Sequence, residues 1–241
     1  MEIKIDDAKY MADCVSAVAS LIEEANIEFT KEGLKILAMD SSSIALVDFN
    51  MPSKAFSKYD VENENLGVNF ENLDKILSRA RDGESMTLKK DKGDKFTIIF
   101  SQGKSSRRYK ISSIELSKTR TTKKITPKIE AELKIKKSDF ETDLKDAMML
   151  SGFLNLSISK NGLNIRAKGD IGELDNLCNP EIISENEVKG TFNLEYLSAM
   201  VKGCDKDSYI NITLANNEPI SLSYNIGDAK LMFVLAPYME E

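Results

Sequence analysis

The chain of 241 residues contains no histidine and no tryptophan, and it has only three cysteines and five prolines. Without histidine, Ser-His-Asp and Cys-His catalysis are excluded, and the commonest zinc ligand is missing. Cys14, Cys178 and Cys204 share no metal-type spacing, so we interpret them as reduced packing residues. We expect neither a bound metal nor a cofactor.

Long apolar runs are also missing. No stretch approaches the ~18 residues that span a bilayer, and the first residues lack the apolar segment of a signal peptide. Hydrophobic residues make up 41% of the chain, which favours a globular protein over a disordered one. The net charge of −6 does not suggest a nucleic-acid partner, so a DNA-binding role would require positive charge gathered on one face. We expect a soluble, intracellular protein.

The chain does contain an internal duplication. Residues 31–38 (KEGLKILA) reappear as residues 160–167 (KNGLNIRA), 129 positions later, and residues 69–73 (NFENL) reappear as 193–197 (NLEYL), 124 positions later. Solenoid repeats are only ~20–50 residues long. A whole domain is therefore predicted to occur twice.

Apolar residues at helical spacing predict helices over about 7–22, 70–80, 138–150 and 194–202. The predicted N-caps are Asp6 or Asp7, Asn69, a capping box of Ser138 with Glu141, and Asn193. Hairpins are expected over 27–38 and over 154–167, the second turning at Asn161-Gly162. Further strands are expected at 43–51, 86–89, 96–100, 108–114, 133–136, 210–214, 220–226 and 231–235. Two helices on a mostly antiparallel sheet in each half make an α+β fold.

With these elements and the duplication, the chain resembles the DNA sliding clamps of the proliferating cell nuclear antigen family, most closely the archaeal ones. The resemblance covers essentially the whole chain and depends on motifs in a fixed order: LAMDSS at 37–42, FSKY at 56–59, GVN at 67–69 before Leu73 and 75–77, YL at 196–197 with MVKG at 200–203, EP at 218–219 and LAP at 235–237. It implies an N-terminal clamp domain over 1–116, a connector over 117–127 and a C-terminal clamp domain over 128–241.

The resemblance implies a ring-shaped homotrimer that encircles duplex DNA, with helices lining the hole and sheets forming the outer wall. Copies would join edge to edge through Tyr109, Lys110 and Ile111 of one chain and Leu174 and Leu177 of the next. Such pairing would remove open sheet edges. The stretch 172–178 alternates poorly for a strand.

Basic residues on the helices would then meet phosphates without reading bases. The candidate DNA-binding residues are Lys9, Lys75, Arg79, Lys145 and Lys202. The chain departs from the family where basic residues are usual, with Ala12, Asp13 and Ala19 in the first helix and Glu195 in the last. The hole is thus expected to be less positive than is typical. The alternative is that these lysines are ordinary solvated charges.

The resemblance also implies a hydrophobic pocket for partner peptides, lined by Met39, Ser43, Ile44, Ile125, Pro127, Pro219, Ala236 and Pro237, to which Leu231 or Phe233 could add. Through this pocket the clamp would tether DNA polymerase, clamp loader, flap endonuclease and DNA ligase during replication and repair. The connector is basic where relatives are often acidic, with Lys118, Arg120, Lys123 and Lys124. The alternative is that the apolar members merely complete the core.

The resulting interpretation is a processivity factor and not an enzyme, located in the cytoplasm with the nucleoid, or in the nucleus of a eukaryote. No G-x-x-x-x-G-K-[ST] loop is present, so opening the ring would need a separate loader. Three alternatives stay open: a subunit of a heterotrimeric or damage-response clamp, a carboxylate-site enzyme on a duplicated α+β fold, and a peptide-binding scaffold that never meets DNA.

Overall fold

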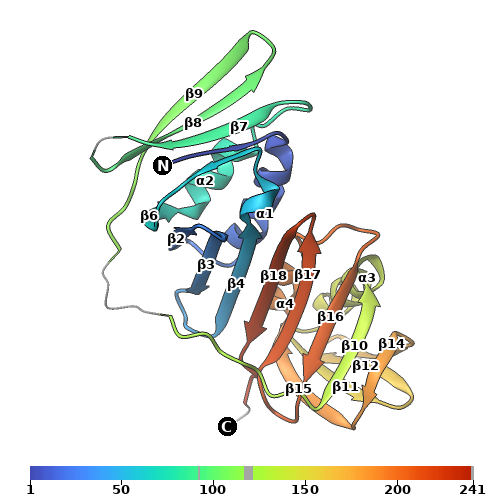
Figure 1. Ribbon diagram of the computed structural model, residues 1–241. Helices are drawn as coiled ribbons and strands as arrows, with labels where there is room; N and C mark the ends of the chain where they lie inside the picture. Colours follow the sequence, from blue (N-terminus) through green and yellow to red (C-terminus); the bar gives the residue numbers. More distant parts are fainter. Residues whose placement is uncertain (92, 117–121, 240–241) are drawn as a thin grey trace. The chain divides into compact units, whose positions relative to one another are not determined.

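The computed structural model describes residues 1–91, 93–116 and 122–239, and within these the same order of elements occurs twice (Figure 1). The first half contains β1 (Glu2–Ile5), α1 (Ala8–Ala19), β2 (Glu24–Thr30), β3 (Gly33–Met39), β4 (Ala45–Pro52), β5 (Lys58–Asp60), β6 (Glu64–Asn69), α2 (Phe70–Leu77), β7 (Ser85–Lys90), β8 (Lys95–Gln102) and β9 (Ser105–Ser112), with a 3-10 turn at Ser53–Ala55. The second half contains β10 (Ala131–Lys136), α3 (Lys137–Met148), β11 (Phe153–Ser159), β12 (Gly162–Gly169), β13 (Gly172–Cys178), β14 (Glu181–Glu185), β15 (Val188–Asn193), α4 (Leu194–Val201), β16 (Tyr209–Leu214), β17 (Ile220–Ile226) and β18 (Ala229–Leu235). The duplicated α+β fold is confirmed.

The chain forms two compact units. The first consists of Met1–Ser41, Val47–Lys123 and Asn225–Leu231, and the second of Ser42–Leu46, Lys124–Tyr224 and Met232–Glu241. Each half therefore lends one short segment to the other half's unit. Part of the predicted connector, residues 117–121 with Lys118 and Arg120, lies outside the described residues. The predicted boundaries at 116 and 128 stay a prediction.

Strand order repeats along with element order. The first half contains a sheet ordered β5-β1-β7-β8-β9 and the strands β4-β3-β2-β6, and the second half contains the corresponding strands β14-β10-β16-β17-β18 and β13-β12-β11-β15. Neighbouring strands pair antiparallel, as β8 and β9 do with Phe96 opposite Ile111. Within the described residues β9 and β13 each end a sheet, so each presents one edge of unpaired backbone groups.

Two equivalent glycines explain why the repeat preserves its KxGL motif. Gly33 has φ of +149° and Gly162 has φ of +128°, in the region that L-residues rarely adopt. A Cβ on Gly33 would lie 2.1 Å from the Met51 carbonyl oxygen, and one on Gly162 would lie 2.2 Å from that of Cys178. Gly33 thus lets β4 pass close to the start of β3, and Gly162 lets β13 pass close to the start of β12. The β11–β12 turn is at Lys160-Asn161, one residue earlier than predicted, because Gly162 already pairs with Ser159.

Three of the predicted helix caps are confirmed. Asp7 Oδ1 accepts from the amides of Lys9 and Tyr10 at 2.9 and 3.2 Å, and Asn69 and Asn193 cap α2 and α4 in the same way. The predicted capping box of Ser138 and Glu141 is wrong. Helix α3 begins at Lys137 after Lys136, which makes no side-chain cap, so Ser138 already lies inside the helix.

The sequence patterns missed several short strands, namely β1, β5, β6, β14 and β15. The sequence suggested that 172–178 would be a poor strand. In the structure β13 is regular and pairs with β12 along its length, from Cys178 opposite Leu163 to Gly172 opposite Gly169. Its odd and even residues differ in burial, but both faces are partly exposed, which blurs the alternation. Among the described residues no helix has the length and apolar character that crossing a bilayer requires.

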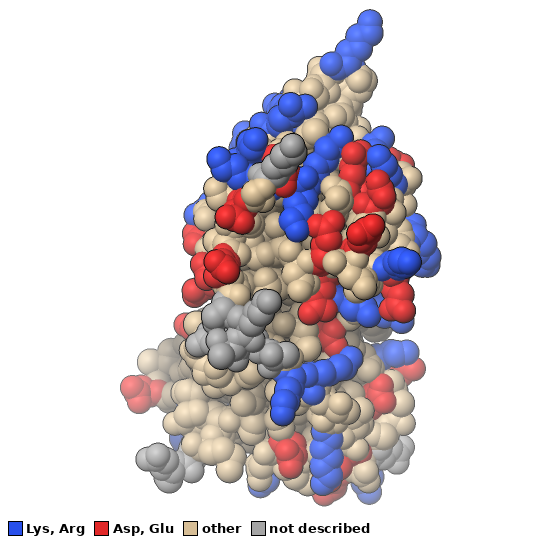
Figure 2. Space-filling model, turned by 60° about the vertical axis from the view of Figure 1, so that its left-hand side comes forward, with Lys and Arg blue, Asp and Glu red and all other residues tan. Residues whose placement is uncertain are grey.

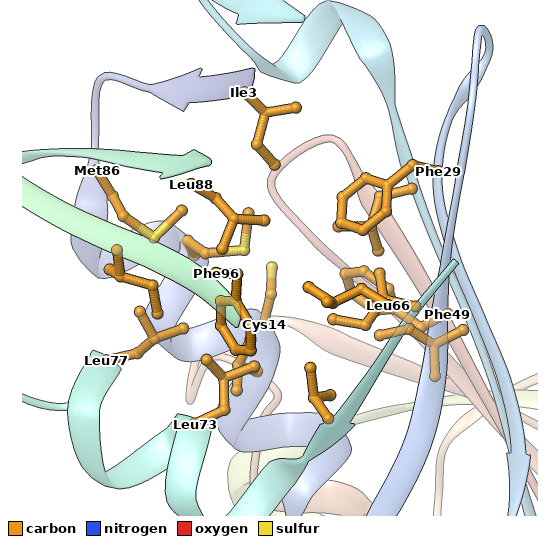
Figure 3. A pocket seen from close by; sticks show the side chains of 17 residues that line it. Ile3, Cys14, Phe29, Phe49, Leu66, Leu73, Leu77, Met86, Leu88 and Phe96 are labelled. Carbon is orange, nitrogen blue, oxygen red and sulfur yellow. The ribbon is translucent and has the colours of Figure 1, made fainter. Parts of the chain in front are cut away.

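The first unit has its core where both helices meet strands from both of its sheets, around a small apolar cavity of about 40 Å³ (Figure 3). Ile3, Cys14, Phe29, Leu73 and Phe96 point toward this cavity from β1, α1, β2, α2 and β8. Burial raises the pKa of the Cys14 thiol far above its ordinary value, which fits an inert packing residue. The lining offers no polar partner for a ligand or a water molecule.

Candidate functional site

The candidate DNA-binding residues lie on or next to all four helices. Lys9 is in the first turn of α1, Lys75 is in α2, Lys145 is in α3, and Arg79 and Lys202 follow the ends of α2 and α4. All five side chains are exposed, while the helices bury apolar residues such as Leu73, Phe140 and Leu197. Since α1 packs on α2 and α3 packs on α4, each unit presents its own helix pair. How the two pairs face one another stays a prediction.

Three of these five cations already have a carboxylate partner. The Lys9 Nζ lies 2.5 Å from Asp82, the Lys75 Nζ lies 2.5 Å from Glu71, and the Lys145 Nζ lies 3.2 Å from Glu141. The hydrogen bond that Lys75 donates to Glu71 lowers the pKa of Glu71, and the one that Lys9 donates to Asp82 raises the pKa of Lys9. On the face shown in Figure 2, Lys and Arg side chains are interspersed with Asp and Glu. The i, i+4 spacing of two pairs could have been read from the sequence.

The two edge strands carry the candidate self-association residues. In β9 the Tyr109 ring packs edge-on against Phe100, with centroids 5.9 Å apart, and Lys110 is exposed with its Nζ 3.5 Å from Asp91. In β9 Ile111 is half-buried, and in β13 Leu174 is half-buried while Leu177 is 61% exposed. Both strands thus combine an open backbone edge with apolar side chains.

Strand β13 is held to α3 by one carboxylate. Asp143 accepts hydrogen bonds from Asn176 Nδ2 at 2.7 Å and from Cys178 Sγ at 3.1 Å. Burial raises the pKa of Asp143, and burial together with this contact raises the pKa of Cys178 to about 12. The thiol therefore stays protonated at neutral pH and serves as a hydrogen-bond donor that fixes the edge strand. Sequence patterns gave no signal for this contact.

Most of the candidate peptide-pocket residues lie in the second unit. The Ile44 carbonyl accepts from the Ala236 amide at 2.9 Å, which joins segment 42–46 to the C-terminal tail. Ile44 and Ile125 are 37% and 36% exposed, which is unusual for isoleucine, and Pro127, Pro219 and Pro237 are half-buried. Ser43 is exposed with φ of +61°. Apolar side chains are therefore available at this surface.

Three other residues expected at the peptide pocket are not part of this exposed surface of the second unit. Met39 is half-buried at the end of β3 in the first unit, so the structure does not join it to the others. Leu231 and Phe233 are 2% and 0% exposed, so the expectation that one of them adds to the pocket is wrong. As alternating residues of β18 they belong to the core.

The C-terminal tail beyond this surface is anchored by contacts that sequence analysis missed. The Tyr238 amide donates to the Thr191 carbonyl at 2.7 Å, and the Tyr238 ring stacks on Phe153 with centroids 4.1 Å apart. These contacts hold Ala236 and Pro237 against β15 and β11 of the same unit. Only the aromatic residue near the chain end could have hinted at this arrangement.

Carboxylates do not gather into a metal site in the described part of the chain, where no group of three or more Cys, Asp or Glu side chains could hold an ion. The carboxyl group with a raised pKa, that of Asp143, points at an amide and a thiol rather than at a second acid.

Comparisons with known proteins agree across the whole length. The family model "Proliferating cell nuclear antigen, N-terminal domain" matches residues 1–123, and the corresponding C-terminal model matches residues 127–239. The chain is 32% identical to the DNA polymerase sliding clamp of Thermococcus fumicolans and 31% identical to DNA polymerase sliding clamp 1 of Thermococcus kodakarensis, covering 100% of this chain and 99% of each relative. The structure of A. fulgidus PCNA, solved with the C-terminal region of FEN-1, has the same fold with a TM-score of 0.88 at 23% identity, over 100% of this chain and 99% of that one. The chain belongs to the proliferating cell nuclear antigen family.

Proposed function

We propose that this protein is a sliding clamp, a processivity factor that encircles duplex DNA as a ring of three copies and tethers replication and repair enzymes. The observation that carries the proposal is the twofold repetition of one fold, in which β9 and β13 each end a sheet and leave one backbone edge unpaired within the described residues. Head-to-tail pairing of two different edges closes into a ring when the rotation between copies allows it. Relatives named as DNA polymerase sliding clamps support this assignment.

Self-association would use β9 of one copy and β13 of the next. Tyr109, Lys110 and Ile111 would face Leu174 and Leu177, and the backbone edges would pair. Exposed charges support the choice of edges, because Arg108 and Lys110 on β9 are basic whereas Glu173 and Asp175 on β13 are acidic. Light scattering of the purified chain should give the mass of a trimer.

DNA would lie against the helices, contacting Lys9, Lys75, Arg79, Lys145 and Lys202 through phosphates only. Phosphate contacts carry no sequence information, so the clamp would move along any duplex. The protein would do no covalent chemistry, need no cofactor and work wherever the cell keeps its DNA. It would depend on a clamp loader for opening.

The direct test is primer extension by a family DNA polymerase on singly primed circular template, with a clamp loader and ATP. Adding this protein should increase the number of nucleotides that the polymerase adds each time it binds the primer. On a linear template with free ends the gain should shrink, since a ring can slide off. Equal stimulation on both templates would contradict encirclement.

Partner enzymes would bind through short peptides whose apolar anchors enter the surface formed in the second unit by Ser43, Ile44, Ile125, Pro127, Pro219, Ala236 and Pro237. Few buried anchors usually carry most of the energy at such a surface. The A. fulgidus protein solved with the C-terminal region of FEN-1 supports a flap endonuclease as one partner. Relatives named as DNA polymerase sliding clamps support a polymerase as another, and DNA ligase is our third proposed partner.

Ile44→Asp tests the pocket. It should weaken binding of a flap-endonuclease C-terminal peptide at least ~30-fold, since it removes apolar burial and leaves a desolvated charge. Thr126→Asp, an exposed residue of the same region outside the predicted pocket, is the matched control. Unchanged peptide affinity of Ile44→Asp in an intact trimer would show that the pocket is misplaced.

One specific observation favours a second candidate, a subunit of a heterotrimeric or damage-response clamp. Pairing of three candidate DNA-binding cations with carboxylates makes the helix faces weakly basic. Purified alone, such a subunit would stay monomeric at micromolar concentration and form a ring only with its partners.

A further inference from the structure

The pairs Glu71–Lys75 and Glu141–Lys145 share one arrangement. Each has the acid four residues before the lysine on the same helix, with Nζ to carboxylate oxygen distances of 2.5 and 3.2 Å. The side chains of Glu71 and Lys75 are 69% and 65% exposed, so both are open to solvent and to an approaching phosphate. The acid-first order is the favourable one on a helix.

Glu141 is shared between two lysines. It accepts from Lys137 at 2.8 Å and lies 3.2 Å from Lys145, and these contacts hold its pKa below the ordinary value despite the opposing effect of burial. Lys137 is nearly buried, so it stays paired when Lys145 leaves. Lys145 can therefore leave Glu141 for a phosphate while Glu141 keeps its ion pair with Lys137.

The other two helix-associated candidates differ. Within the described residues, the side chains of Arg79 and Lys202 form no ion pair. Lys75 has a counterpart in the repeat at Ala199, and Glu71 has one at Glu195, so α4 keeps the acid and lacks the lysine. Glu195 therefore occupies the same helical position as Glu71 but has no lysine four residues later to pair with.

We propose that Glu71 and Glu141 are built-in competitors of DNA phosphate that keep the contacts of Lys75 and Lys145 weak and rapidly exchanged. The inference rests on the proposed clamp function and deepens it. A phosphate that approaches Lys75 must replace Glu71, so each contact is made against an existing one. A ring held by topology has no need of tight contacts, and weak ones let it slide.

The expected size follows from the exposed geometry. An exposed i, i+4 pair is worth about 0.3–0.5 kcal/mol, so each carboxylate should weaken its lysine's phosphate contact about twofold. The salt dependence should also be shallow. A lysine that contacts a phosphate displaces about 0.9 cation from DNA, but salt also screens the competing Glu–Lys pair and so partly frees the lysine.

The test compares Glu71→Gln, Glu141→Gln and the double variant with Glu195→Gln. All single variants change the charge by the same amount, and Glu195→Gln releases no lysine. Glu71 and Glu195 are both exposed, so Glu71→Gln is the closer match to the control, whereas Glu141 is half-buried and its substitution also removes the partner of Lys137. Affinity for a short, open-ended duplex is measured by fluorescence anisotropy at several salt concentrations, after light scattering shows an unchanged oligomer. For each copy that contacts the duplex, the double variant should bind about fourfold more tightly. This gain should exceed that expected from two charge changes of the Glu195→Gln kind, and the salt slope should be steeper. If Glu71→Gln and Glu141→Gln behave like Glu195→Gln, the inference is wrong.

Lysine variants separate this failure from failure of the proposed function. Lys75→Ala and Lys202→Ala should both weaken binding, and Lys202→Ala more strongly because Lys202 has no competing carboxylate. If both weaken binding while the glutamine variants match the control, only the competition is refuted. If neither lysine variant changes binding, the helix faces do not meet DNA, and the DNA-binding assignment falls together with the inference.

Discussion

Leu177 offers the sharpest test of how copies join. It lies on edge strand β13 with 61% of its surface exposed, so it contributes little to the stability of one copy. Full burial of a leucine side chain is worth about 1.5–3 kcal/mol, so covering the exposed part in a subunit contact would contribute about 1–2 kcal/mol. Leu177→Ala should remove most of that from each contact while leaving the protomer folded.

A ring of three copies multiplies the loss. Three contacts would together lose about 3–4.5 kcal/mol, which raises the trimer dissociation constant by about 10²–10³. The concentration at half-dissociation varies as the square root of that constant, so it should rise about 10–40-fold. Sedimentation or light scattering over a dilution series measures this midpoint, and thermal unfolding of the monomer should be nearly unchanged.

The matched control is Ile183→Ala. Ile183 is 47% exposed on β14, which lies at the end of the sheet β14-β10-β16-β17-β18. Its substitution should leave the midpoint in place. A Leu177→Ala trimer that dissociates at the parental concentration would refute the assignment of β13 to the interface, and an equal shift from Ile183→Ala would point to β14.

Three further substitutions test the fold. Gly162→Ala should destabilise the protein by about 1–3 kcal/mol because of its positive φ and the carbonyl beside it, whereas Gly152→Ala, with nothing near its Cβ, should be neutral in urea unfolding. Burial alone would raise the pKa of Glu84, but hydrogen bonds from a backbone amide and from Arg107 hold it below the ordinary value. The resulting stability is complete above the unfolded pKa of about 4.3 and is lost as the pH falls through the folded one, so Glu84→Gln should cost about 1–3 kcal/mol at pH 7 and much less at pH 3. Val68→Ile should fill part of the first unit's cavity and add up to about 0.8 kcal/mol, and a lower melting temperature would show that the void cannot accept a methyl group.

Helices and their caps were predictable because their signals are local. Asn69 and Asn193 precede apolar residues at helical spacing, and the structure confirms both as caps. The error at Ser138 has a local cause as well. Ser138 resembles an N-cap, but β10 runs directly into the helix at Lys137, whose amide donates to the Ser208 carbonyl, so the helix begins before Ser138.

Short strands escaped because their pairing is set by distant residues. β5 has only three residues, two of them charged, and becomes a strand by lying against β1 with Tyr59 opposite Ile3. β6 contains Gly67, which suggests a turn in the sequence. In the fold that glycine admits the Ile114 carbonyl, 2.1 Å from where a Cβ would lie. A close approach between segments almost 50 residues apart leaves no periodic trace.

Site residues were predictable as residue types but not as contacts. Family motifs pointed to Lys75 and to Ile44, yet neither the pairing of Lys75 with Glu71 nor the tail contact between Tyr238 and Phe153 entered that prediction. The i, i+4 spacing of Glu71 and Lys75 was a local signal for their pairing, whereas Tyr238 and Phe153 are far apart in the sequence and only the fold brings their rings together. The assignments of DNA, peptide and interface residues remain predictions that the variants above can test.

The duplication separates what the fold requires from what each helix face does. Residues repeated in both halves, such as Gly33 with Gly162 and Asn69 with Asn193, occupy positions where backbone geometry or a cap leaves little choice. Lys75, in contrast, has Ala199 as its counterpart, and both halves fold. The exposed charges on the helices are therefore free to differ between units, so the affinity of the clamp for DNA must be derived helix by helix. An estimate that counted the basic residues of one half and doubled the number would overstate the attraction to DNA, because α4 lacks a counterpart of Lys75 and other lysines are already paired with carboxylates.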